Sequence, residues 1–369
     1  MRTPICDMFG IEFPIFAFSH CRDVVAAVSR AGGMGVLGAL YFTPDELEIE
    51  LRWIDDHVDG KPYGVDVVMP AKYVGAEIDA GSLMEELQKS IPEEHKKFVE
   101  AILDKYNVPK LPADEPAPHQ LLGWTDQTAR PQLDVCWEHP IALLVNALGA
   151  PPKDVVDEAR RRGVKVAALV GRIEQAIAQK EAGVDFIVAQ GTEAGGHTAE
   201  VATMVLVPEV VDAVAPTPVL AAGGIGSGRQ MAAGLALGAQ GVWTGSIWLT
   251  VAEADTPPVV VQKLFDASSR DTVRSRVMSG KPARMLRTKW TEEWDDPKNP
   301  DPLPMPLQWM LTSEAYHRIY RYQPEELIGM PVGQIVGSMK SVRSARDVIF
   351  DMVTECADTL ERLNGLVTD

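Results

Sequence analysis

The sequence predicts a closed (β/α)8 barrel, the TIM-barrel fold, and two observations carry that prediction. Short apolar runs rich in β-branched residues recur along the chain, at 14–18, 34–38, 64–68, 142–148, 164–170, 186–190, 218–222 and 241–244. Amphipathic stretches separate most of them, for instance 23–30, 44–57, 152–162, 173–182 and 228–237. Strands that alternate with helices form parallel sheets, and eight such units in about 250 residues favour a closed barrel over an open doubly wound sheet.

Two segments interrupt this alternation. Residues 70–130 are charged and rich in proline, with one helical pattern over 91–106, and we interpret them as an insertion after the third strand. Residues 258–369 are predicted to be mostly helical, with an irregular loop over 290–306. The expected domains are therefore a barrel over 1–257 and a helical C-terminal region over 258–369, which packs back over the mouth of the barrel.

The composition is that of a globular protein and argues against several kinds of partner. Of the 369 residues, 46% are hydrophobic and 24% are charged, and the formal net charge is −17. This negative charge argues against nucleic acid or an anionic membrane surface. No apolar run is long enough to span a bilayer, and the N-terminus lacks the apolar segment of a signal peptide. The scattered cysteines and histidines predict no metal site, and a reducing cytoplasm fits them best.

The most informative stretch is residues 190–197, Gln-Gly-Thr-Glu-Ala-Gly-Gly-His, which follows an apolar strand. Gly191, Gly195 and Gly196 allow close approach of a ligand or positive φ angles. The amide of Gln190 could pair with a heterocycle. His197 is a candidate acid or base, against the alternative of a hydrogen-bonded structural histidine. Glu193 could orient His197, lie in the loop as a solvated carboxylate, or form a salt bridge elsewhere.

A second glycine-rich strand end predicts a phosphate site. Residues 219–229 read Val-Leu-Ala-Ala-Gly-Gly-Ile-Gly-Ser-Gly-Arg, which is a strand, a glycine loop and a helix start. Backbone N–H groups at a helix N-terminus bind phosphate, and barrels often bind it after strands 7 and 8. The next strand ends in Gly245-Ser246, which could add further donors. The alternative is a tight turn of structural glycines, and the run is not the GxGxxG of a dinucleotide fold.

Polar residues at the ends of other strands are further candidates. His20 follows the first strand and could contact a substrate, or it could belong to a helix N-cap region in which Ser19 or Asp23 is the cap. Asp66 and Asn146 lie inside apolar strands, where a buried polar group needs a partner. A polar cofactor edge would serve, as would the backbone or water inside the barrel.

These motifs together resemble the nitronate monooxygenase family of FMN-dependent TIM barrels. The family signature Gln-Gly-x-Glu-Ala-Gly-Gly-His stands at 190–197, its Ala-Ala-Gly-Gly-Ile stretch at 221–225, and its Ser-Gly-x-Pro-Ala-Arg element at 279–284. The resemblance covers residues 10–290. Three positions depart from the usual pattern: Phe16-Ala-Phe replaces Ala-Pro-Met, Asp66 replaces an asparagine, and residues 145–149 replace a Ser-Phe-His-Phe-Gly segment.

The resemblance implies a cofactor, FMN, and a set of site residues. It makes His197 the catalytic base, whereas His20 and Glu193 are candidate substrate contacts from their positions at the strand ends alone. The residues that it implies around FMN are Gln190, Gly191, Gly223, Gly224, Gly245 and Ser246. From their places at the strand ends and in the glycine loops, we expect further cofactor contacts at Ala17, Phe18, Asp66, Asn146, Gly195, Gly196 and Ala222. The implied reaction is the oxidation of an alkyl nitronate with O2 to a carbonyl compound and nitrite.

Two other activities remain open from the sequence. The same type of barrel resembles FMN reductases that take hydride from NAD(P)H and act on a quinone or an enoyl thioester. A phosphate-binding isomerase or lyase without flavin belongs to a different class. In each case the partner is a small molecule, and the helical tail could cover the active site, form a homodimer contact, or do both.

Overall fold

The computed structural model describes residues 2–69, 80–115 and 126–367, and the eight predicted strands form a closed parallel barrel in it. The strands are β1 (Ile15–Ser19), β2 (Met34–Gly38), β3 (Tyr63–Asp66), β4 (Leu143–Asn146), β5 (Lys165–Val170), β6 (Phe186–Gln190), β8 (Val219–Ala222) and β9 (Gly241–Thr244). The ring closes where β1 pairs with β9, with Phe16 opposite Trp243. The predicted closed barrel is confirmed.

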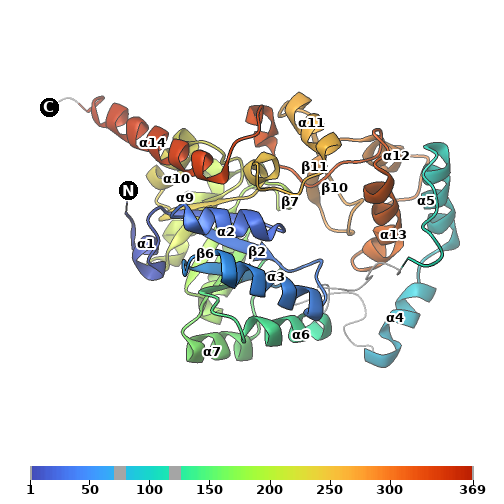
Figure 1. Ribbon diagram of the computed structural model, residues 1–369, viewed down its shortest axis with the longest axis horizontal. Coiled ribbons are helices and arrows are strands. Elements are labelled where there is room, and N and C mark those ends of the chain that lie inside the picture. Colours follow the sequence, from blue (N-terminus) through green and yellow to red (C-terminus); the bar gives the residue numbers. More distant parts are fainter. Residues whose placement is uncertain (1, 70–79, 116–125, 368–369) are drawn as a thin grey trace.

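Large apolar side chains fill the barrel and a short helix closes one end of it. Phe16, Leu143, Phe186 and Trp243 belong to one buried cluster inside the ring. Helix α1 (Pro4–Phe9) lies across the end where the strands begin (Figure 1). Its Phe9 ring packs edge-on against Phe16 and Phe186, with ring centroids 5.6 and 5.8 Å apart. Because α1 covers this end, we expect a ligand to bind at the opposite end, where the strands finish.

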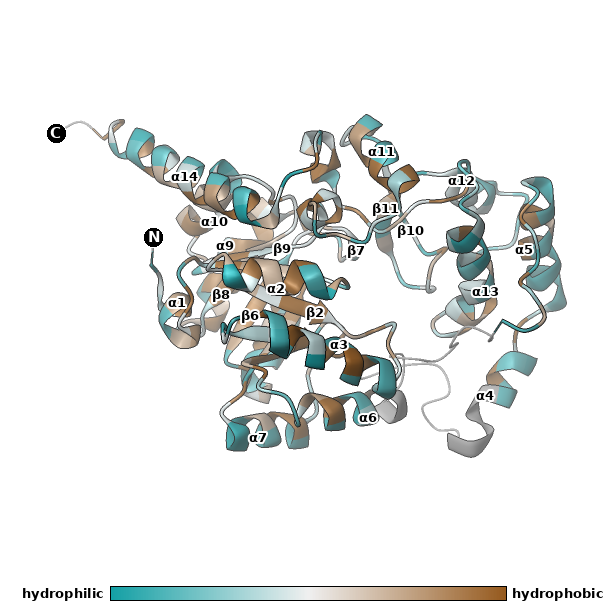
Figure 2. Ribbon diagram, viewed as in Figure 1, coloured by the Kyte–Doolittle hydropathy of each residue, from teal (hydrophilic) through white to brown (hydrophobic). Residues whose placement is uncertain are grey.

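Eight helices surround the barrel, and the eighth comes from the C-terminus of the chain. They are α2 (Arg22–Arg30), α3 (Pro44–His57), α6 (Asp126–Cys136), α7 (Lys153–Arg162), α8 (Ile173–Ala182), α9 (Thr203–Val214), α10 (Gly228–Ala236) and α14 (Ala345–Asn364). Helix α14 packs on both α10 and α2, which closes the ring of helices. The helices alternate hydrophobic and hydrophilic residues around hydrophobic strands (Figure 2). The predicted C-terminal region thus contains a barrel helix, and the proposed boundary at residue 257 cuts the barrel's own outer layer.

Between β9 and α14 the chain makes a long excursion that is less helical than predicted. Its elements are η1 (Ser246–Thr250), α11 (Pro258–Asp266), β10 (Thr272–Ser275), β11 (Ala283–Leu286), α12 (Lys289–Asp295), α13 (Leu307–Tyr322) and η2 (Gln334–Ser338). Strands β10 and β11 form an antiparallel hairpin, and β11 also pairs with β7 (Gly196–His197). The predicted irregular loop over 290–306 is wrong at its start, which is the helix α12. These short strands exist because they pair with each other and with a distant loop, which no local pattern records.

The insertion after β3 packs on this excursion. Helices α4 (Ala80–Lys89) and α5 (Glu93–Lys105) lie beside α13 (Figure 1), and α5 matches the helix predicted over 91–106. The guanidinium of Arg318 in α13 is buried and donates to the carbonyls of Val108 and Pro109, each at 2.9 Å. The predicted insertion ran to residue 130, but α6 begins at Asp126 and packs on α3 as a barrel helix. Residues 70–79 and 116–125 of the predicted insertion lie outside the described residues.

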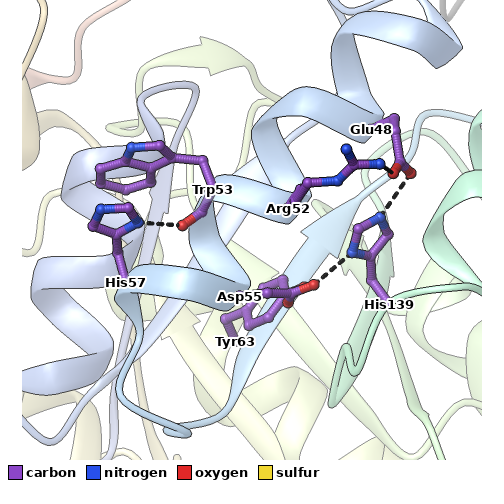
Figure 3. A network of polar contacts seen from close by, with 7 residues as sticks. All are labelled: Glu48, Arg52, Trp53, Asp55, His57, Tyr63 and His139. Carbon is purple, nitrogen blue, oxygen red and sulfur yellow. Dashed lines mark hydrogen bonds and ion pairs between the residues drawn. The ribbon is translucent and has the colours of Figure 1, made fainter.

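A cluster of titratable side chains ties α3 to the N-terminal ends of β3 and β4 (Figure 3). His139 lies between two carboxylates, with Nδ1 2.6 Å from Asp55 and Nε2 2.9 Å from Glu48. The hydroxyl of Tyr63 donates to Asp55 at 2.6 Å. Burial alone would lower the pKa of His139, but the hydrogen bonds to Asp55 and Glu48 outweigh it, and the pKa is raised. The cluster lies at the closed end of the barrel, so we assign it a structural role.

Candidate functional site

A cavity of about 880 Å³ opens at the C-terminal ends of the barrel strands. Gln190 and Ala222 line it from the strand ends, whereas Trp290 and Tyr316 line it from the excursion between β9 and α14. The volume lies within the usual range for cofactor and substrate sites. Helix α1 closes the end of the barrel where the strands begin, and the cavity lies at the end where they finish. Active sites of (β/α)8 barrels occur at this second end.

Most of the residues expected from the sequence meet in this cavity. Those that line it are Phe18, His20, Asp66, Gln190, Gly195, Gly196, His197, Ala222, Gly223, Gly224, Gly245 and Ser246. Ala17, Asn146, Gly191 and Glu193 are not among its lining residues in the described part of the chain.

The four residues away from the cavity wall have structural surroundings. Ala17 is fully buried between strands. The side-chain amide of Asn146 is hydrogen-bonded to the backbone. Its Oδ1 accepts from Met69 N at 3.0 Å, and its Nδ2 donates to the Met69 carbonyl at 3.1 Å. A Cβ on Gly191 would overlap the side chain of Thr203, so this glycine permits close packing of the chain. Glu193 accepts from Thr203 N at 3.0 Å and from Thr203 Oγ1 at 2.9 Å, and so binds the start of α9 rather than His197.

One end of the cavity offers backbone N–H groups. Gly223 and Gly224 have φ angles of 98° and 67°, which favour glycine, and a Cβ on Gly223 would lie 2.7 Å from Thr203 Oγ1. Within the described residues, no protein acceptor faces the N–H groups of Gly223, Gly224 or Gly245. A Cβ on Gly245 would meet nothing within 4 Å. These groups suit an anion that approaches the backbone closely.

The helix N-terminus expected to bind phosphate is already occupied. At the start of α10, Gly228 N donates to a carboxylate oxygen of Glu355 at 2.7 Å, and Arg229 Nε donates to the other oxygen at 2.7 Å. Glu355 belongs to α14, which the sequence could not place here. The backbone N–H groups that could bind an anion are therefore those of Gly223, Gly224 and Gly245 in the loops after the strands, and not those at the start of α10.

His197 is held on a short strand by its pairing with Ala283. Its Nε2 lies 2.6 Å from Oγ of Ser279, a fully buried residue of the hairpin region. Burial, with a smaller contribution from the charge of Lys281, lowers the pKa of His197 to about 4. The imidazole is therefore neutral near pH 7 and can accept a proton.

His20 forms part of the opposite wall. Its Nδ1 donates to the carbonyl of Gly38 at 2.8 Å, and its ring lies edge-on to Phe18 with centroids 5.1 Å apart. Burial lowers the pKa of His20. Ser19 Oγ accepts from Cys21 N at 3.1 Å, so it supports the turn before α2 without capping the helix. With Nδ1 committed to Gly38, the neutral ring has Nε2 as its acceptor.

Asp66 has an unusual environment for a carboxyl group. It is 3% exposed and lines the cavity, and its Oδ1 has no hydrogen-bond partner among the described residues. Burial raises its pKa to about 7, partly offset by a hydrogen bond with the Ala147 backbone. No lysine or arginine is among the described residues that line the cavity.

The sequence interpretation missed an aromatic wall contributed by the excursion. Trp290 Nε1 donates to the hydroxyl of Tyr316 at 3.0 Å, and the Trp309 and Tyr316 rings stack with centroids 6.2 Å apart. Tyr41 from the barrel extends this wall, 6.0 Å from Trp309 between centroids. The signal was present in α13, where Trp309, Tyr316 and Tyr320 recur at spacings of one helix face.

Two absences among the described residues bear on other classes of function. No group of three or more His, Cys, Asp or Glu side chains among them could hold a metal ion. None of the helices there has the combination of length and apolarity that a bilayer crossing demands.

Comparison with known proteins gives the family. The model of the nitronate monooxygenase family matches residues 2–355. The Mycobacterium tuberculosis protein named "Putative monooxygenase Rv1533" is 56% identical, over 100% of both chains. Among solved structures, the nitroalkane oxidase from Streptomyces ansochromogenes aligns with a TM-score of 0.81 and 26% identity, over 97% of this chain and 99% of that one. FabK from Thermotoga maritima aligns with a TM-score of 0.74 and 28% identity, over 100% of both chains. The chain therefore belongs to the nitronate monooxygenase family and is a flavin-dependent oxidoreductase.

Proposed function

We propose that this protein binds FMN and oxidises alkyl nitronates with O2, giving a carbonyl compound and nitrite. The observation that carries the proposal is a neutral, buried histidine in a cavity that also presents backbone N–H groups without a protein acceptor among the described residues. His197 supplies the proton acceptor, and Gly223, Gly224 and Gly245 supply donors for a phosphate.

FMN fits the donor set of the cavity. Its phosphate would lie at Gly223–Gly224 and Gly245, whose N–H groups donate to no protein acceptor within the described residues. The flat ring would cross the strand ends past Gln190, whose amide can both donate and accept. When bound, the flavin supplies electron transfer from the nitronate and passes electrons to O2.

His197 would remove the α-proton from a neutral nitroalkane. A base must be unprotonated at the working pH, and a pKa of about 4 meets this condition at pH 7. Ser279, 2.6 Å from Nε2, would fix the orientation of the imidazole. The same low pKa leaves little protonated imidazole to hold the charge of a nitronate, so the structure favours proton removal as the role of His197.

Anaerobic reduction of the bound flavin tests the proposal. The purified protein would be mixed without O2 with propionate-3-nitronate, NADH or NADPH, and flavin absorbance would be followed. Rapid bleaching by the nitronate alone supports the proposed reaction. Rapid bleaching by NADH or NADPH, with none by the nitronate, would overturn it. A protein without flavin absorbance that does not take up added FMN would overturn the cofactor as well.

A second candidate is an NAD(P)H-dependent FMN reductase acting on a quinone or an enoyl thioester. The full-length similarity to FabK supports it, as does the aromatic wall of Trp290, Trp309 and Tyr316, which suits a larger apolar substrate. The NADH and NADPH arms of the same experiment decide between the two.

A further inference from the structure

Among the described residues, Asp66 is a buried acid whose surroundings call for a ligand. The side chain is 3% exposed and lines the cavity, and its Oδ1 has no partner among the described residues. A buried polar atom without a hydrogen bond costs about 1–3 kcal/mol, so such atoms are rare unless a ligand satisfies them.

Within the described part of the chain, the neighbours of Asp66 provide neither a cation nor a donor for Oδ1. On β4, Asn146 is committed to Met69 and to the Gly149 carbonyl, and only the Ala147 backbone approaches the carboxyl. On the β2 side, Asp66 pairs with Gly38, whose carbonyl holds the His20 ring, and burial lowers the pKa of His20. Across the cavity, His197 is neutral near pH 7. The surroundings therefore favour the protonated, uncharged carboxyl group.

The barrel geometry places Asp66 opposite the anion site. In the ring order β1-β2-β3-β4-β5-β6-β8-β9, β3 lies directly across from β8, which leads into Gly223–Gly224. A ligand with its phosphate at those glycines must cross the mouth of the barrel to reach β3. The group that arrives at Asp66 is then the edge of the flat ring.

We propose that Asp66 is a carboxylic acid that donates a hydrogen bond from Oδ1 to an acceptor atom on the edge of the bound flavin ring. This inference rests on the proposed FMN cofactor. A protonated carboxyl group can donate a hydrogen bond here as an amide would. Unlike an amide, it can no longer donate once it ionises. Ionisation would also bring a negative charge to an acceptor atom, and no lysine or arginine among the described residues that line the cavity would offset it. Asp66 therefore makes the affinity for flavin depend on pH. Burial raises the pKa of Asp66 to about 7, which places this dependence near neutral pH.

The test is the dissociation constant of FMN, measured by flavin fluorescence between pH 6.5 and 9. For the wild-type protein, Kd should rise up to about tenfold per pH unit above pH 7. Asp66→Asn keeps a donor without titrating, so its Kd should stay within about threefold of the wild-type value at pH 6.5 and remain flat. Asp66→Leu, which has a similar shape and no donor, should bind FMN at least about tenfold more weakly at pH 6.5. The phosphate of FMN titrates near pH 6 in all three proteins, so their difference isolates Asp66.

Other results separate the possible sources of failure. A wild-type Kd that is flat with pH, or an Asp66→Asn profile that follows the wild type, would overturn the role of Asp66 while leaving FMN in place. No FMN binding by the wild type would instead overturn the proposed function. In another outcome, pH affects only the binding of propionate-3-nitronate to the FMN-loaded protein. That result would show that Asp66 contacts the substrate, and it would overturn the proposed contact with flavin.

An infrared measurement keeps the inference testable if Asp66→Leu does not fold. The carbonyl band of a protonated carboxyl group should shift when FMN binds to the wild type at pH 6.5. The shift should be missing in Asp66→Asn. The same shift in both proteins would count against Asp66.

Discussion

At the scale of single residues, the cavity separates the expected candidates into two groups. His197, Gln190 and Asp66 face the same space from different strands. In the sequence, Asn146 and Glu193 were ligand candidates like these three. In the structure, however, their side chains form hydrogen bonds with Met69 and Thr203. A polar residue at a strand end is thus a ligand candidate only if no backbone group reaches it first.

The proposed role of His197 predicts a loss of proton transfer without a loss of cofactor. His197→Asn should retain FMN and lower turnover of a neutral nitroalkane about 10²- to 10⁴-fold, because the side chain assigned to take the α-proton is removed. The preformed nitronate needs no such step and should lose much less, which makes it the matched control. For the wild type, the protonation of His197 should leave no inflection in kcat/KM between pH 6 and 8, since its pKa is about 4. Equal losses on both substrates would argue against His197 as the base.

Gly245 offers a test of the phosphate site that spares the fold. A methyl group there would meet no protein atom within 4 Å, and the φ angle of −129° lies outside the left-handed region that favours glycine. Gly245→Ala should therefore leave the thermal unfolding of the FMN-free protein unchanged and raise the Kd of FMN about tenfold, because the methyl group occupies the space of the phosphate. Gly365→Ala lies at the end of α14, where φ is −69° and an added methyl group would lie 3.5 Å from the nearest protein atom, and it is a control that should leave the Kd unchanged. An unchanged Kd for Gly245→Ala would move the phosphate elsewhere.

At the scale of elements, the N-terminal ends of the strands are held by charge and the C-terminal ends are left open for a ligand. Asp55, Glu48 and His139 join α3 to the segment between α6 and β4 (Figure 3). At the open end, Gly223, Gly224 and Gly245 keep their N–H groups unpaired within the described structure. Stability and binding are thus divided between the two ends of the barrel.

The His139 cluster predicts a pH dependence of stability. The pKa of His139 is raised in the folded state, so its contribution is complete below about pH 6.5, the unfolded value, and is lost as pH rises through the folded pKa. His139→Gln should lower the free energy of unfolding by about 2 kcal/mol at pH 6, where two charge-assisted hydrogen bonds are broken. The difference from wild type should shrink toward pH 9. Urea unfolding at both pH values measures this, and a difference that grows with pH would contradict it.

At the scale of the whole molecule, the chain leaves the barrel twice and returns twice. The insertion between β3 and α6 and the excursion between β9 and α14 meet beyond the mouth of the barrel, where Arg318 binds the carbonyls of Val108 and Pro109. Helix α14 then completes the ring of barrel helices by packing on α10 and α2. The barrel therefore depends on residues from both ends of the sequence.

This arrangement predicts that residues 1–257 do not fold as a domain. The fragment lacks α14, whose Ile349, Met352 and Cys356 are buried, and it lacks the Glu355 carboxylate at the start of α10. Exposed apolar faces of α10 and α2 should make it aggregate or lose cooperative unfolding. Truncation to 1–364, which keeps all of α14, should remain monodisperse and unfold cooperatively. A fragment 1–257 with a sharp thermal transition would restore the boundary predicted from the sequence.

The sequence by itself determined the eight strands and the glycine-rich loops of the site. Both are local requirements: a strand buried on two faces must be apolar, and positive φ angles at Gly223 and Gly224 favour glycine. Only the tertiary structure decided which groups meet. Ser279 lies 2.6 Å from His197, Glu355 takes the helix end expected for phosphate, and the aromatic wall comes from α12 and α13. These contacts join segments far apart in the chain, and they follow from the path of the backbone, which no local pattern of residues encodes.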